Sequence, residues 1–170
     1  MKKVAFIALV TVLSLVHSTA ALAQRIEING LRLGMTKTEI EKKFGALPLK
    51  DFKIAKVSGK FPVRLAFHEG KLDELMFFFS SDSFNDVHKA VTSKYPLIAC
   101  TDSTLTSPTE KKFTQVNCKM KDQLGTLRLD RFVRDIDTSA LILISDRLFQ
   151  ELETKRKEKQ TDKEKSKANN

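Results

Sequence analysis

The side chains that could bind a metal or form a disulfide in this chain are a small set of histidines and cysteines. Beyond residue 23, the histidines are His68 and His88, and the cysteines are Cys100 and Cys118. A zinc site needs three or four converging ligands, usually at a close spacing such as His-x-x-x-His. Because no such spacing occurs, we expect no metal and no cofactor. A cysteine pair without a neighbouring His/Cys motif instead predicts a Cys100–Cys118 disulfide in an oxidising compartment.

Acyl or glycosyl transfer would need a triad or a carboxylate dyad. The members of a Ser-His-Asp triad converge only in the folded protein, so the sequence alone leaves a small hydrolase open. The chain lacks the Gly-x-Ser-x-Gly turn and any glycine-rich phosphate loop. Neighbouring carboxylates such as Asp73 and Glu74 are more often ordinary surface residues than the acid and base of a catalytic dyad. We therefore expect a protein that is not an enzyme, and a cluster of His68 or His88 with serine and aspartate would favour the hydrolase.

The first 23 residues have the pattern of a signal peptide. A basic start at 1–3 precedes an apolar run at 4–16, and Ala-Leu-Ala at 21–23 supplies the small residues of a cleavage site. The run is shorter than the roughly 20 residues of a membrane span. We predict cleavage between Ala23 and Gln24, with an uncleaved anchor as the less favoured alternative. We therefore expect a bacterial protein that is periplasmic or secreted. Because no cysteine directly follows the cleavage site, we expect no lipid anchor.

The rest of the 170-residue chain is long enough for one domain with a substantial core. We expect a single α+β domain over 24–152 and a charged, flexible or frayed-helical tail over 153–170. No second long apolar run follows the leader, so we expect no transmembrane span in the mature chain. The formal net charge of +9 favours anionic envelope surfaces as contacts. Nucleic acid is not expected, because no dense basic stripe carries interleaved aromatic residues.

The clearest local signal is a short helix near the amino end. Thr36 is placed as its N-cap, and Glu39 three residues later completes a capping box. The helix is predicted to end at Phe44, with Gly45 in the left-handed position that follows a helix. Ile40 and Phe44 share one face, so this helix should pack on an apolar surface.

Alternating apolar residues predict an antiparallel sheet carrying two short helices, an α+β fold. A second helix is expected from a cap at Ser83 to just before Pro96, and a third short helix from a cap at Asp146. A loop rich in serine, threonine and proline is expected over 102–110. An alternative grouping is two helix-plus-three-strand units. The expected strands span 52–57, 61–67 (an edge strand, from Pro62), 72–79, 97–101, 113–120, 127–133 and 139–145.

The stretch from Gly30 to Gly45 carries a Gly-Met-Thr motif followed by the capping glutamate and Phe44-Gly45. It resembles the motif of small bacterial envelope proteins, namely the SmpA/OmlA-like outer-membrane assembly lipoproteins and the β-lactamase-inhibitor-like group. The resemblance implies small helices on an antiparallel sheet and a protein-binding role. This chain departs from the lipoproteins, because it has no lipidated cysteine and separates its helices by strands. Only the architecture is therefore carried over.

Three consecutive phenylalanines mark the predicted binding surface. On a strand, Phe78 points opposite to Phe77 and Phe79, so a single layer of helices would leave one of these faces exposed. We expect Phe77, Phe79, Arg128 and Arg131 to form an apolar and basic surface. In the alternative, the helices and the tail cover both faces of the sheet, and the three phenylalanines are buried in the hydrophobic core.

These features predict an exported, non-catalytic binding protein of the bacterial cell envelope, which contacts another protein through a sheet face or edge. Two alternatives differ in partner or in chemistry. One is an adaptor to anionic envelope polymers through the basic tail, from Lys155 to Lys167, and the other is the small hydrolase.

Overall fold

The computed structural model describes residues 25–106, 110–133 and 135–168, with side chains described up to residue 159. The predicted leader and its cleavage site between Ala23 and Gln24 lie outside these residues. The described chain is an α+β fold, as the sequence predicted.

One six-stranded antiparallel sheet organises the molecule, with the strand order β3-β4-β8-β7-β6-β5. The pairing of β4 with β8 joins the strands that follow the first helix to those that follow the second. β3 lies at one edge, in agreement with the expectation from Pro62. The strands are Arg64–His68 (β3), Lys71–Ser80 (β4), Ala99–Thr106 (β5), Lys112–Lys121 (β6), Gly125–Asp130 (β7) and Thr138–Ser145 (β8).

The first helix, α1 (Lys37–Phe44), begins as its sequence predicts. The backbone N–H of Glu39 donates to Thr36 Oγ1 at 3.3 Å, and the N–H of Thr36 donates to Glu39 Oε2 at 2.7 Å. This capping box satisfies two N–H groups that would otherwise have no partner. Gly45 follows with φ of 90°, and the buried side chain of Ile40 faces the sheet.

The second helix, α2 (Phe84–Lys94), is preceded by a 3₁₀ turn, η1 (Ser81–Ser83). Ser83 was predicted to cap this helix, but its side chain makes no cap hydrogen bond. The turn moves the cap upstream, where Ser80 Oγ accepts from the N–H of Asp82 at 3.4 Å. The helix still buries the face that its spacing predicts, consisting of Phe84, Val87 and Val91.

Two expected strands differ from those observed. The residues 52–57 form a small hairpin of β1 (Lys53–Ile54) and β2 (Val57–Ser58), because Ala55 and Lys56 adopt positive φ and reverse the chain. β5 continues to Thr106, into the region expected to be a loop, because β6 pairs with it as far as Lys112.

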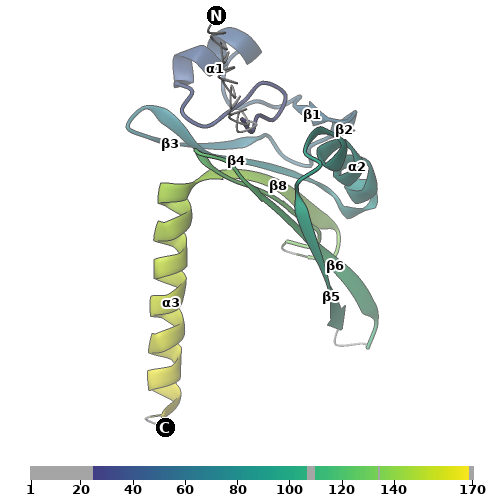
Figure 1. Ribbon diagram of the computed structural model, residues 1–170, viewed down its shortest axis with the longest axis vertical. Coiled ribbons are helices and arrows are strands. Elements are labelled where there is room, and N and C mark those ends of the chain that lie inside the picture. Colours follow the sequence, from purple (N-terminus) through teal and green to yellow (C-terminus); the bar gives the residue numbers. More distant parts are fainter. Residues whose placement is uncertain (1–24, 107–109, 134, 169–170) are drawn as a thin grey trace, which may run out of the picture.

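The third helix, α3 (Asp146–Ala168), starts where a short helix was expected and continues through the tail, which agrees with the helical option of the two left open there. Asp146 was predicted as its cap, but Ser145 Oγ accepts the N–H of Leu148 at 3.1 Å instead. In Figure 1, α1 and α2 lie above the sheet, whereas α3 runs down from the end of β8 and away from both. No helix in the described part of the chain is long and apolar enough to cross a membrane.

Candidate binding surface

α1 and α2 cover only one face of the sheet, and the opposite face carries a second, smaller apolar cluster. The strand register places these residues side by side, because Phe78 pairs with Ala140 and Met76 pairs with Ile142. The side chains of Leu148 and Phe149, from the first turn of α3, pack on this cluster. We call this surface the open face; its apolar residues are Met76, Phe78, Ala140, Ile142 and Ile144.

Exposed apolar side chains stand at two sides of the open face. Phe61 is 52% exposed, and its ring lies edge-on to Phe78 at a centroid distance of 6.4 Å. It is held there because the N–H of Lys60 donates to the carbonyl of Phe78 at 2.8 Å. Leu152 is 45% exposed and lies one turn beyond Leu148 on the same side of α3. Large apolar side chains therefore extend the buried cluster toward solvent.

Arginine and aspartate lie beside this apolar cluster on β7. Arg128 pairs in register with Ile142, and its Nη2 donates to Asp130 Oδ2 at 2.7 Å. Burial raises the pKa of the Asp130 carboxyl, and the charge of Arg128 opposes that shift. The Nε of Arg128 is buried and has no hydrogen-bond partner. The guanidinium is thus only partly satisfied within the protein.

A second acid, Glu74, lies under the β3 side of the same face. It sits between Ala66 and Ile144 in register and is 4% exposed. Burial raises the pKa of its carboxyl, and the charge of Arg64 opposes this effect. Arg64 and Lys119 are themselves exposed. The acids on the strands of the open face, Glu74 and Asp130, are therefore buried, whereas Arg64 and Lys119 are exposed. At the root of α3, Asp146 and Glu151 are partly exposed and form ion pairs with basic side chains.

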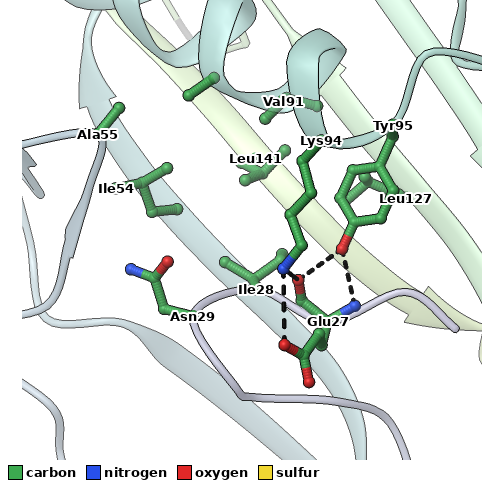
Figure 2. Close-up of a pocket in the computed structure, with 11 residues that line it drawn as sticks. Glu27, Ile28, Asn29, Ile54, Ala55, Val91, Lys94, Tyr95, Leu127 and Leu141 are labelled. Atoms are coloured by element: carbon green, nitrogen blue, oxygen red, sulfur yellow. Dashed lines mark hydrogen bonds and ion pairs between the residues drawn. The ribbon is translucent and has the colours of Figure 1, made fainter.

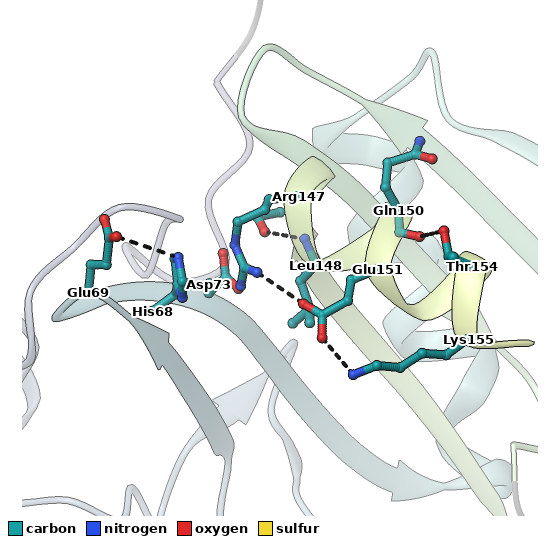
Figure 3. Close-up of polar contacts among 10 residues, drawn as sticks. His68, Glu69, Asp73, Arg147, Leu148, Gln150, Glu151, Thr154 and Lys155 are labelled. Carbon is teal, nitrogen blue, oxygen red and sulfur yellow. Dashed lines mark hydrogen bonds and ion pairs between the residues drawn. The ribbon is translucent and has the colours of Figure 1, made fainter.

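The root of α3 is fixed to the sheet by ion pairs (Figure 3). The guanidinium of Arg147 bonds to the carboxylate of Asp73 on β4 and, at 3.1 Å, to Glu151 on the next turn. Glu151 also accepts from Lys155 Nζ at 2.6 Å. Because Asp73 is buried, this pair sets where α3 leaves the sheet and which part of the open face it covers.

The four predicted binding residues do not form one surface. Phe77 and Phe79 are 0% exposed and stack on each other at 5.6 Å in the core beneath the helices, so the prediction of their exposure is wrong. The physical reason is that α1 and α2 cover the face holding two of the three phenylalanines. Arg128 does lie on the open face. Arg131 turns toward α2, with its guanidinium 5.5 Å from the ring centre of Phe84.

Sequence reasoning missed Phe61 as an exposed residue of this surface, and Met76 and Phe78 as members of the apolar cluster beside it. One signal was available, because Phe78 points opposite to its two neighbours and shares a face with any residue two positions away. What the sequence lacked was the register that joins it to Ala140, and the placement of Phe61 beside it.

Among the described residues, neither His68 nor His88 forms part of a Ser-His-Asp cluster. His68 is the last residue of β3, with Nε2 3.9 Å from the carboxylate of Glu69, as seen in Figure 3. His88 lies on α2 beside the disulfide, which joins Cys100 to Cys118 as predicted. In the described residues, no serine or aspartate side chain bonds to either imidazole.

A small cavity opens between α2, the amino-terminal segment and the sheet (Figure 2). Its volume is about 120 Å³, and apolar side chains such as Leu127 and Leu141 form part of its wall. Across its rim, Tyr95 Oη donates to the carbonyl of Glu27 at 2.6 Å, and Lys94 Nζ reaches the same oxygen at 3.0 Å. Pockets for drug-sized ligands are roughly 300–1,000 Å³. This cavity is too small to carry the function.

Comparison of the chain with protein-family models, with curated proteins and with solved structures found no match in any of the three. The resemblance of Gly30 to Gly45 to envelope proteins therefore stays a prediction. The function has to be argued from the open face and its surroundings.

Proposed function

We propose that this protein is an exported, non-catalytic binding protein of the bacterial cell envelope, which holds a segment of another protein against its open face. The observation that carries this proposal is the apolar cluster on the sheet face opposite α1 and α2, with Phe61 and Leu152 exposed beside it. Export rests on the leader-like residues 1–23, and the Cys100–Cys118 disulfide supports it, because disulfides persist in oxidising compartments.

The physical chemistry of the open face favours a partner that is partly apolar. Burying apolar surface stabilises association by roughly 25 cal/mol per Å², and exposed apolar patches mark sites of protein contact. The Phe61 ring already lies edge-on to Phe78, so a partner side chain inserted next to it meets an ordered aromatic surface. Such rigid aromatic anchors lose little conformational entropy on binding.

The charges around the open face favour acidic residues in the same partner segment. Arg64 and Lys119 are exposed there, whereas Glu74 and Asp130 are each 4% exposed and face the protein. An acidic partner segment meets the exposed Arg64 and Lys119, whereas the partly exposed acids at the root of α3, Asp146 and Glu151, are already paired with basic side chains. Such complementarity raises the association rate and the specificity. The proposed ligand is therefore an apolar segment of an envelope protein that also carries Asp or Glu.

Photo-crosslinking in intact cells tests this proposal. A photo-reactive phenylalanine analogue is placed at position 61, at position 152 and, as a control, at Leu97. Leu97 is 82% exposed but lies in the turn between α2 and β5, away from the open face. We expect positions 61 and 152 to capture the same envelope protein and position 97 to miss it. Equal capture at all three positions would contradict the proposal.

Affinity measurements with the captured partner then test the chemistry. Phe61→Ser should weaken binding at least tenfold, whereas Leu97→Ser should leave the dissociation constant unchanged. Arg64→Glu should slow association most strongly at low salt, because exposed charges act mainly on the association rate. A partner segment without acidic residues, or one whose binding does not change with Phe61→Ser, would count against this surface.

A second candidate function is adhesion to anionic envelope polymers, and the observation that favours it is the exposure of α3. This helix extends away from the sheet in Figure 1, and Lys155, Arg156 and Lys159 are exposed along it. We expect salt-sensitive association with envelope fractions that is lost on truncation after Leu152. Retention of the truncated protein on the envelope would remove this candidate.

A further inference from the structure

We propose that His88, Cys100 and Cys118 form a redox-gated site for a thiophilic d¹⁰ metal ion, Zn²⁺ or Cu⁺, which fills only when the disulfide is reduced. The imidazole nitrogen and the two sulfur atoms all lie within 4.8 Å of one another. Sequence spacing did not predict this site, because its ligands come from three separate elements. Thiolate and imidazole are the ligands that these two ions prefer in proteins.

The fold brings the three side chains together from α2, β5 and β6. Cys100 and Cys118 are directly opposite each other in the register of the β5–β6 pair. His88 reaches over from α2, with Nε2 3.6 Å from Cys100 Sγ. With metal–sulfur and metal–nitrogen bonds of about 2.3 and 2.0 Å, two ligand atoms of a tetrahedral ion lie about 3.5 Å apart. The His88–Cys100 pair already has this spacing.

The imidazole is held in position, and the site is accessible from solvent. The ring of His88 stacks on the buried Phe84 at a centroid distance of 5.7 Å and an interplanar angle of 18°. Cys100 is exposed, so a reductant and an ion can reach its sulfur, whereas Cys118 is buried and forms the inner wall. One side open to water and one side closed are typical of a three-ligand site that keeps a free coordination position.

Reduction is what opens the site. In the oxidised protein the two sulfurs are bonded at 2.12 Å, and a sulfur bound in this way is no longer a thiolate ligand. Two equivalents of a small thiol RSH break this bond, giving two cysteine thiols and one RSSR. The ion then displaces both thiol protons and forms two metal–sulfur bonds and one metal–nitrogen bond. In the zinc form, water takes the fourth position.

The test uses the purified protein without oxygen, and Co²⁺ serves as the spectroscopic probe for zinc. After reduction and removal of the reductant, we expect one Co²⁺ per chain, with a thiolate charge-transfer band and the visible bands of a tetrahedral ion. Zn²⁺ should displace it. The oxidised protein should show neither band. A parallel titration with Cu⁺ against a chromophoric chelator distinguishes the two ions, and binding of only one of them shows which ion the reduced site selects.

Two histidine variants provide the matched control. His88→Ala should weaken metal binding to the reduced protein at least tenfold, because a ligand is lost. His68→Ala removes the exposed histidine at the end of β3 and should leave binding unchanged. Circular dichroism of each reduced variant checks that the sheet persists. Reduced protein that binds neither Co²⁺ nor Cu⁺, or equal affinities for the two variants, would overturn the proposal.

Discussion

At the scale of single residues, burial decides the electrostatics of the open face. Glu74 and Asp130 are each 4% exposed, and desolvation raises the pKa of both carboxyls. A basic neighbour opposes the shift in each case, Arg64 for Glu74 and Arg128 for Asp130. Burial wins over the charge partner in both, so the native state favours the protonated form of each acid more than the unfolded chain does.

Glu74→Gln should stabilise the protein at neutral pH by about 1 kcal/mol. The pKa of Glu74 is higher in the folded protein than in the unfolded chain. At pH values between these two pKa values, the folded protein therefore binds more protons than the unfolded chain. The free energy of unfolding of the unmodified protein therefore falls as pH rises through that range. The amide that Glu74→Gln introduces stays uncharged, so the variant does not lose this stability. Urea unfolding from about pH 4 to about pH 8 measures this.

The matched control for Glu74→Gln is Glu158→Gln, on an exposed position of α3, which should leave the unfolding curve unchanged. If Glu74→Gln instead destabilises the protein at neutral pH, then attraction to Arg64 outweighs the cost of burying the Glu74 carboxylate.

Tyr95 is the only tyrosine of the chain, and its hydroxyl anchors the amino-terminal segment. It donates to the carbonyl of Glu27 at 2.6 Å and accepts from the N–H of Glu27 at 2.9 Å (Figure 2). Tyr95→Phe leaves two backbone groups without this partner, so we expect a loss of about 1–3 kcal/mol in unfolding free energy. Lys94→Met removes an exposed contact to the same residue and should cost less than about 0.5 kcal/mol. Equal losses in the two urea titrations would argue against the buried hydroxyl as the anchor.

At the scale of elements, the sequence predicts best what is encoded locally. The start of α1 was predictable because Thr36 and Glu39 satisfy each other's backbone within one turn. The β1–β2 hairpin was not, because Ala55 and Lys56 adopt positive φ without the glycine that normally marks such a turn. The sequence left the tail over 153–170 open between a flexible segment and a frayed helix. α3 continues through it to Ala168, where few apolar residues mark a helix and ion pairs such as Glu151–Lys155 support it.

Thr36→Ala should destabilise the protein by about 1 kcal/mol, because it removes the side-chain acceptor at the N-cap of α1. Thr38→Ala is the matched control, since Thr38 is exposed two residues further along the helix and has no role in the capping box. Thermal unfolding of both variants measures the difference. A smaller loss for Thr36→Ala than for Thr38→Ala would mean that packing of Ile40, rather than the cap, defines the start of α1.

At the scale of the whole molecule, the limit of sequence reasoning was the choice between two apolar faces. The alternation of Phe77 and Phe78 predicts that β4 is apolar on both sides, and this is observed. Which side the helices cover depends on long-range register, such as Phe77 opposite Leu141. For the same reason the approach of His88 to Cys100 could not be predicted, because it depends on how α2 crosses the sheet.

Two truncations separate the structural part of α3 from its exposed part. The described contacts of α3 with the sheet come from its first turns, through Arg147, Leu148 and Phe149. Ending the chain after Leu152 should therefore change the free energy of unfolding by less than about 0.5 kcal/mol. Ending it after Ser145 uncovers the open-face cluster and leaves Asp73 without its guanidinium, so we expect a loss of about 3 kcal/mol.

The same two truncations decide between the candidate partners. A protein segment held by the open face should still bind the chain that ends at Leu152, because Phe61, Phe78 and Leu152 are all retained. An anionic polymer held by α3 should be lost from that chain, since the exposed Lys155, Arg156 and Lys159 and the later lysines of the tail are gone. Both expectations are checked by measuring how the purified truncated protein binds the crosslinked partner and how it binds envelope fractions, each at low and high salt. If the chain ending at Leu152 instead loses as much free energy of unfolding as the chain ending at Ser145, then the distal turns of α3 stabilise the fold.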